Sequence, residues 1–114
     1  MSKGIYIATL LATILTARAG RITFNGHTET WYNMRMTYVC QRAQQIGIQG
    51  DYWVRDDGVK MYGPWVIVAA NWDIHPYGTV LETSRGYGMV LDTHTADDKE
   101  VIDIATNWGK GGKK

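Results

Sequence analysis

Apolar and polar positions follow one another in short runs over most of the chain, and this pattern is typical of β-strands. The first run is interrupted by Asn25-Gly26, the dipeptide most typical of a two-residue hairpin turn. A later run, residues 65–71, is continuously apolar and predicts a buried strand. The strand-like runs are residues 21–32, 65–71, 79–84, 89–93 and 101–108. We expect tight turns between them, including one at Gly86-Tyr87-Gly88.

One segment has a helical period instead. Apolar side chains recur there on one face of a helix, whereas Arg and Gln side chains fill the other face. Asn33 is a suitable N-cap residue and Gly47 a suitable residue just beyond the C-terminus. We therefore expect an amphipathic helix over about residues 34–46. Its apolar face holds Met36, Val39, Cys40, Ala43 and Ile46.

One helix followed by several short strands predicts a mainly β fold, a small β-barrel with an inserted helix. The chain has 114 residues, which suits one domain with a modest core. Hydrophobic residues make up 45% and charged residues 20%, as in globular proteins. We expect the domain over residues 20–108, followed by a flexible basic tail over residues 109–114.

The N-terminus has the features of an export signal. Lys3 precedes an apolar run over residues 5–15, and small residues at Ala17 and Ala19 suit cleavage before Gly20. We expect residues 1–19 to be a signal peptide; the alternative is a strand or helix of the fold. The run is too short to span a bilayer, so we expect no stable membrane span in the mature form.

Charge and reactive side chains narrow the class of partner. The net charge of +1, with no basic stripe among aromatics, argues against a nucleic-acid partner. Cys40 is the only cysteine, so no internal disulfide can form, and its place on the apolar helix face predicts a core residue. His27, His75 and His94 lack the spacing of metal ligands. We expect neither a metal nor another cofactor.

Two carboxylates interrupt apolar runs. Asp92 follows residues 89–91 and Asp103 follows residues 101–102, all of them apolar. A carboxyl group in low dielectric has a raised pKa, as a general acid requires near neutral pH. Two such groups brought together would push their pKa values apart. The alternative is that each aspartate ends a strand or accepts a hydrogen bond from a turn amide.

Short motifs in a fixed order cover about two-thirds of the chain. They are "ETWYN" (29–33), "YWVRDDGVKMYG" (52–63), "VAAN" (68–71), "PYGT" (76–79), "ETSRGYG" (82–88), "DT" (92–93) and "DIATNW" (103–108). This order resembles the three-aspartate domain of Gram-positive cell-wall-active proteins. That family belongs with membrane-bound lytic transglycosylase A, rare lipoprotein A and expansins, whose members cleave or loosen β-linked polysaccharides.

The resemblance implies a six-stranded double-psi β-barrel. In the lytic transglycosylases of this superfamily, one aspartate acts as general acid and then base on the bond between muramic acid and glucosamine. The muramic 6-hydroxyl closes on C1 and leaves an anhydro sugar. By position, Asp103 matches the catalytic residue, and Asp92 matches the aspartate of a preceding "DT" motif that positions or tunes it.

The chain departs from the family pattern at two places. The first family aspartate is Asn71 here, which can only hydrogen-bond, and His94-Thr95 replaces two glycines that follow the "DT" motif. Aromatic faces pack well on pyranose rings, although core packing explains the same side chains equally well. The substrate-binding residues expected are Asn71, Thr93, Trp31, Tyr32 and Trp72.

Three functions follow as expectations. The first is a secreted or wall-associated monomer that cleaves peptidoglycan as a lytic transglycosylase, because a single acid favours the intramolecular route over hydrolysis between two carboxylates. The alternative is a non-catalytic, expansin-like barrel that binds cell-wall glycan. A phage or mobile-element protein that carries the domain for wall penetration is a third possibility.

Overall fold

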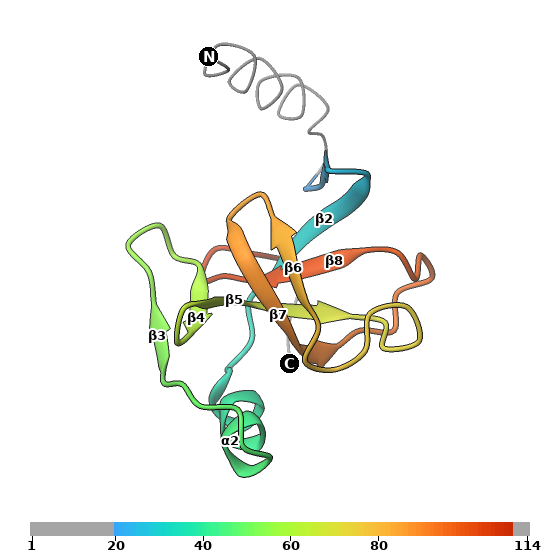
Figure 1. Ribbon diagram of the computed structural model, residues 1–114. Coiled ribbons are helices and arrows are strands. Elements are labelled where there is room, and N and C mark those ends of the chain that lie inside the picture. The colour runs from blue at the N-terminus through green and yellow to red at the C-terminus, as the bar shows by residue number, and fades with distance from the viewer. Residues whose placement is uncertain (1–19, 111–114) are drawn as a thin grey trace, which may run out of the picture.

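The computed structural model of the protein describes residues 20–110. The expected signal peptide, residues 1–19, and residues 111–114 of the expected tail lie outside the described residues. The fold is mainly β, with one helix among the described residues (Figure 1). The elements are β1 (Ile22–Phe24), β2 (His27–Tyr32), α2 (Thr37–Gln45), β3 (Tyr52–Val54), β4 (Lys60–Tyr62), β5 (Trp65–Ala70), β6 (Val80–Thr83), β7 (Gly86–Thr93) and β8 (Ile102–Ala105).

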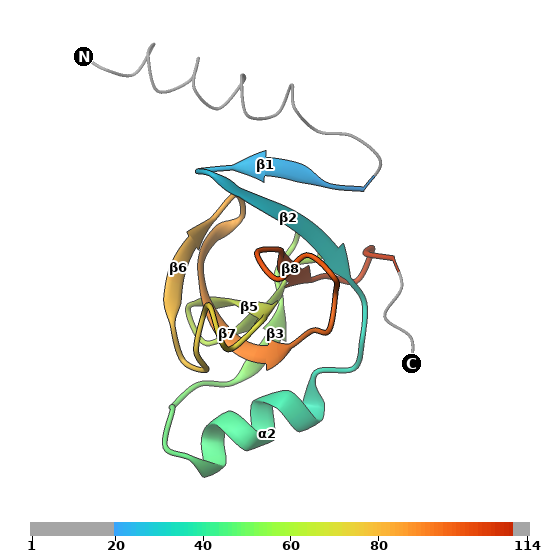
Figure 2. The ribbon, with the colours of Figure 1, turned by 90° about the vertical axis from the view of Figure 1, so that its right-hand side faces the viewer.

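The strands form one mixed, unclosed sheet of eight strands, two more than expected. Its main path is β1-β2-β8-β5-β4-β3, and β7 and β6 extend from β5 on a branch. The pairs β2–β8 and β5–β7 are parallel, and the other pairs are antiparallel. In Figure 2, strands β1 and β2 lie at the top of the described part of the domain and α2 at the bottom. The additional strands include β3 and β4, which have three residues each and flank the Asp56-Asp57-Gly58 turn.

Strand β5 is the centre of the sheet because it pairs with three strands. Val68 pairs with Val90 of β7 on one edge and with Ile104 of β8 on the other. The first residues of β5 pair with β4, on the same edge as β8. The side chains of β5 are also buried on both faces of the sheet, which explains its continuously apolar sequence. The buried strand predicted at residues 65–71 is confirmed.

Alternation along the strands divides the core into two clusters, one on each face of the sheet. The first cluster also includes α2, whose Cys40 is 4% exposed, so its predicted core role is confirmed. Its members are Tyr32, Met36, Cys40, Ala43, Tyr62, Ile67, Ala69, Met89, Leu91 and Ala105. The second cluster contains Val59, Met61, Val66, Val68, Ala70, Val90, Ile102 and Ile104.

The helix begins later than expected. Met36 occupies the N-cap position without a side-chain cap, so the predicted cap at Asn33 is wrong. The Asn33 side chain is used elsewhere, because its Oδ1 accepts a 2.7 Å hydrogen bond from Lys60 Nζ. Gly47 lies just beyond the helix at φ +96°, as predicted, and donates to the Gln44 carbonyl. Among residues 20–110 no helix is long and apolar enough to cross a membrane.

Two predicted turns have different outcomes. Asn25 and Gly26 both have positive φ, 49° and 84°, and join β1 to β2 as a hairpin, as expected. Gly86-Tyr87-Gly88 is not a turn, because all three residues belong to β7. A Cβ atom at Gly88 would lie 2.7 Å from Val68 Cγ2, so glycine allows β7 to approach β5 closely.

The segment after β8 packs along β2. The Thr106 amide donates to the Tyr32 carbonyl at 2.8 Å, and Lys110 forms a parallel bridge with Tyr32. A Cβ at Gly109 would lie 2.6 Å from the Tyr32 nitrogen. Gly109 and Lys110 are therefore part of the folded domain, in contrast to the flexible tail predicted from residue 109.

The Gly58→Ala variant tests how tightly this segment packs on the β3–β4 turn. Gly58 has φ +88°, and a Cβ there would lie 2.7 Å from Trp108 Cδ1. Gly78 has φ +89° with open space around it, so Gly78→Ala is the matched control. In urea denaturation, we expect both variants to lose about 1–2 kcal/mol of unfolding free energy from backbone strain. Gly58→Ala should lose about 1–3 kcal/mol more from the clash; equal losses would contradict this packing.

Candidate functional site

Asp92 and Asp103 lie in one row across three strands. Asp103 of β8 pairs with Ala69 of β5, and Ala69 pairs with Asp92 of β7. Paired residues of neighbouring strands project to the same face of a sheet. The two carboxylates therefore flank the methyl group of Ala69, on the face of the first core cluster.

A β-bulge gives Asp92 this orientation. Val68 pairs with Val90, but the next residue, Ala69, pairs with Asp92, so Leu91 is the extra residue on β7. Without the bulge, strict alternation would send Leu91 and Asp92 to opposite faces. A bulge re-aims the side chains that follow it, and this one brings Asp92 to the face that holds Asp103.

A cavity of about 420 Å³ opens over this row. Four of the predicted site residues line it, namely Tyr32, Asp92, Thr93 and Asp103. The remaining walls come from Met34, Ala69, His94, Thr95 and Ala96. The structure thus brings together the two predicted catalytic residues and two of the predicted substrate-binding residues.

Both oxygens of the Asp92 carboxylate accept hydrogen bonds. Tyr32 Oη donates to Oδ2 at 2.8 Å, and the Thr93 amide donates to Oδ1 at 2.9 Å. The pKa of Tyr32 is raised well above its usual value, first by burial and then by the negative charge of Asp92. The phenol therefore keeps its proton and remains a donor to Asp92.

Asp103 has a different environment. It is half-buried, and its Oδ1 accepts one side-chain hydrogen bond, from Thr30 Oγ1 at 2.9 Å. Burial raises the pKa of Asp103, and the charge of Asp92 raises it further, against the opposing effects of Thr30 and His94. Asp103 consequently keeps its proton to higher pH than an ordinary aspartate, which is the property of a general acid.

His94 holds the loop at the rim of the cavity. Its Nδ1 accepts a hydrogen bond from the Ala96 amide at 3.2 Å, so the ring proton lies on Nε2, which is 2.7 Å from the Val101 carbonyl. Both ring nitrogens are thus used to close the loop over residues 94–101. Among residues 20–110 no group of three His, Cys, Asp or Glu side chains is placed to hold a metal ion.

Three predicted substrate-binding residues lie outside the cavity lining. Asn71 stabilises a turn, because its Oδ1 accepts the Asp73 amide at 2.9 Å. Trp31 lies on the other face of β2, against the second cluster, with its ring 5.6 Å from that of Trp108. Trp72 donates from Nε1 to the backbone carbonyl of Asp92 at 2.9 Å and therefore helps to fix the backbone that carries Asp92.

The expected stacking surfaces are also covered. The ring of Trp72 makes an edge contact with Tyr77, 5.3 Å between centroids, and the Arg42 guanidinium lies 5.9 Å from it. Tyr32 is 6% exposed, so its ring is core and only its hydroxyl serves the site. The core alternative for these aromatic residues therefore agrees better with their contacts than sugar stacking does.

Sequence reasoning missed a buried lysine that supports one wall. Lys60 is 6% exposed, and its Nζ donates to Asn33 Oδ1 at 2.7 Å and to the Met34 carbonyl at 2.6 Å. Burial lowers the pKa of Lys60. Lysines are seldom buried without a charged partner, and this one ties β4 to the segment that carries Met34 into the cavity wall. The sequence signal was weak: Lys60 lies between the apolar residues Val59 and Met61, and all three are buried.

The chain matches no protein-family model and no curated protein. The function of the site is therefore inferred from the residues and contacts of this chain.

The variant Asp103→Asn tests the protonation of this residue through stability. A raised folded-state pKa means that the contribution of Asp103 to stability is present below its unfolded pKa and is lost as pH rises through its folded pKa. The unfolding free energy of Asp103→Asn minus that of the wild type should therefore increase from about pH 3 upward. Asp97→Asn, in the exposed loop, is the control. A difference that stays constant with pH would contradict the raised pKa of the half-buried Asp103.

Tyr32→Phe tests the hydrogen bond to Asp92. The variant removes a buried donor and leaves Asp92 Oδ2 without its partner, at an expected loss of about 1–3 kcal/mol in unfolding free energy. Tyr38→Phe removes a hydroxyl from a side chain that is 74% exposed and should change stability little. Urea denaturation of both variants measures the difference, and equal stabilities would show that the Tyr32 hydroxyl is not engaged.

Proposed function

We propose that the protein cleaves the glycan strands of peptidoglycan, with Asp103 as the general acid. The observation that carries the proposal is the half-buried Asp103, whose pKa is raised, in one cavity with Asp92, each of whose carboxylate oxygens accepts a hydrogen bond. We further propose that the fold is a small double-psi β-barrel. The two parallel pairs, β2–β8 and β5–β7, within an otherwise antiparallel sheet support it.

Asp103 acts twice in the proposed reaction. The protonated carboxyl gives its proton to the glycosidic oxygen as the bond to C1 of muramic acid breaks. The resulting carboxylate takes the proton of the muramic 6-hydroxyl, whose oxygen bonds to C1. The sugar leaves in its anhydro form, and Asp103 is again protonated. General acid–base catalysis by one carboxyl group meets both steps.

The contacts of Asp92 favour this route over hydrolysis. A hydrolase needs a second carboxylate to activate water or to attack C1. Both oxygens of Asp92 already accept hydrogen bonds, from Tyr32 and Thr93. In the proposed mechanism Asp92 is a fixed carboxylate whose charge adds to the effect of burial in raising the pKa of Asp103. Hydroxyls of Thr93 and Thr95 on the cavity wall suit a sugar ligand, and the proposal places the mature protein at a Gram-positive cell wall.

A non-catalytic barrel that binds wall glycan, as expansin-like relatives do, is the second candidate. The observation that favours it is Asn71. This residue replaces the first aspartate of the family pattern and stabilises a turn outside the cavity lining.

Mass spectrometry of purified Gram-positive peptidoglycan incubated with the protein separates the candidates. We expect anhydro-muropeptides from the wild type and from Asp97→Asn, the exposed-loop control. Asp103→Asn should lose at least about 100-fold in rate, the range of general acid catalysis.

Products with reducing ends would show that the protein hydrolyses the bond and would contradict the lytic transglycosylase reaction. Retained binding to insoluble peptidoglycan without any product would favour the non-catalytic barrel, and neither binding nor product would reject both candidates.

A further inference from the structure

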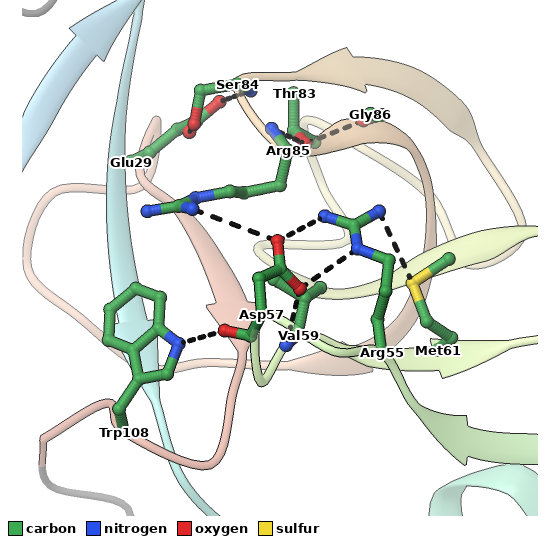
Figure 3. Close-up of polar contacts among 10 residues, drawn as sticks. All are labelled: Glu29, Arg55, Asp57, Val59, Met61, Thr83, Ser84, Arg85, Gly86 and Trp108. Carbon is green, nitrogen blue, oxygen red and sulfur yellow. Dashed lines mark hydrogen bonds and ion pairs between the residues drawn. The ribbon is translucent and has the colours of Figure 1, made fainter.

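Two arginines converge on one carboxylate where the β3–β4 turn lies beside the β6–β7 turn (Figure 3). Arg55 donates from Nε and Nη2 to the two oxygens of Asp57, at 3.0 and 2.9 Å. Arg85 Nη1 lies 3.9 Å from Asp57 Oδ2. Two guanidinium groups against one carboxylate leave one positive charge uncompensated.

Arg85 is held in place without using its hydrogen-bond donors. Its guanidinium lies 5.2 Å from the centre of the Trp108 ring, and Trp108 Nε1 donates to the Asp57 carbonyl at 2.9 Å. Within the part of the chain that the structure describes, this guanidinium makes no hydrogen bond, and it is 37% exposed. A guanidinium has five N–H donors in a planar fork that matches carboxylate and phosphate groups.

A buried carboxylate fixes the turn that carries Arg85. Glu29 is fully buried, and it accepts the Ser84 hydroxyl at 2.5 Å, the Ser84 amide at 2.9 Å and His27 Nε2 at 2.8 Å. A buried charge is costly unless it is fully hydrogen-bonded. The hydrogen bonds of Glu29 orient Ser84, the residue just before Arg85.

We propose that Arg85 and Arg55 form a binding site for an oxyanion, a carboxylate or phosphate group of a ligand. Asp57 of the same chain already accepts hydrogen bonds from Arg55. The oxyanion of the ligand binds the free N–H donors of Arg85 and shares Arg55 with Asp57. The low pKa of Asp57, lowered to about 2 chiefly by its hydrogen bonds with Arg55, agrees with a positive potential at this point.

The site is separate from the Asp92–Asp103 cavity and does not depend on the proposed glycan chemistry. Arg55 Nη1 contacts Met61 Sδ at 3.9 Å, and Met61 belongs to the second core cluster, on the other face of the sheet. No residue of the Arg55–Arg85 site lines the cavity.

An NMR titration of the arginine Nε–Hε signals tests the proposal, with inorganic phosphate in one series and acetate in another, at constant ionic strength. We expect saturable shifts of Arg85 and Arg55, and the anion that saturates identifies the class of ligand. Arg85→Lys keeps the charge but loses the fork, so affinity should fall about tenfold. Unchanged urea denaturation of this variant would show that the fold is intact.

Two matched variants separate a specific site from general charge. Asp57→Asn removes the internal competitor and should tighten binding about fivefold, whereas Asp56→Asn makes the same change in net charge and should not. Arg42 is a control within the same spectrum, because it also lies over aromatic rings, 5.5 Å from the centre of Tyr77. Equal shifts at Arg42 and Arg85, equal effects of the two aspartate variants, or no saturation would overturn the proposal.

Discussion

The pairing of β5 with three strands is the constraint on which the rest of the structure depends. Because β7 pairs with one edge and β4 and β8 share the other, both edges of β5 are hydrogen-bonded within the sheet. Its side chains are apolar because each face of the strand contributes to a core cluster. The same pairing places Ala69 between Asp92 and Asp103. Its methyl group leaves room for a cavity there, and a larger side chain would fill it. One strand thus organises both core clusters and the candidate site.

Local signals in the sequence predicted much of the fold. The residue types of Asn25-Gly26 predict a hairpin turn, and the continuous apolar run of β5 predicts a buried strand. The pattern also singled out Asp92 and Asp103, because both interrupt apolar runs. It could not show that they share a face, since the bulge at Leu91 is a property of strand pairing. Residue types alone likewise could not decide which aromatic residues are core. Trp31 and Trp72 pack against other aromatic rings, and the ring of Tyr32 is buried. These contacts exist only in the folded sheet.

Two carboxylates that are shielded from solvent, Asp103 in part and Glu29 fully, accept hydroxyl groups from other segments of the chain. Asp103 accepts the hydroxyl of Thr30 from the neighbouring strand, and Glu29 accepts the hydroxyl and amide of Ser84 from a turn. The consequences differ. Asp103 is half-buried with one such donor and a negative neighbour, so its pKa is raised and it keeps its proton to higher pH than an ordinary aspartate. Glu29 is fully bonded, so it serves to orient the turn that presents Arg85. One chain thus offers an acid in a cavity and a cationic fork on the opposite face.

A carbon-detected NMR titration of the aspartate carboxyl groups, in the wild type and in Asp92→Asn, tests the central claim most directly. We expect the Asp103 signal to titrate at higher pH than an ordinary aspartate, and its midpoint to fall when Asp92 loses its charge. Such a shift would show a buried acid that is coupled to its neighbour across Ala69. An Asp103 midpoint in the ordinary range, unchanged in Asp92→Asn, would contradict both the shared cavity and the role of Asp103 as an acid.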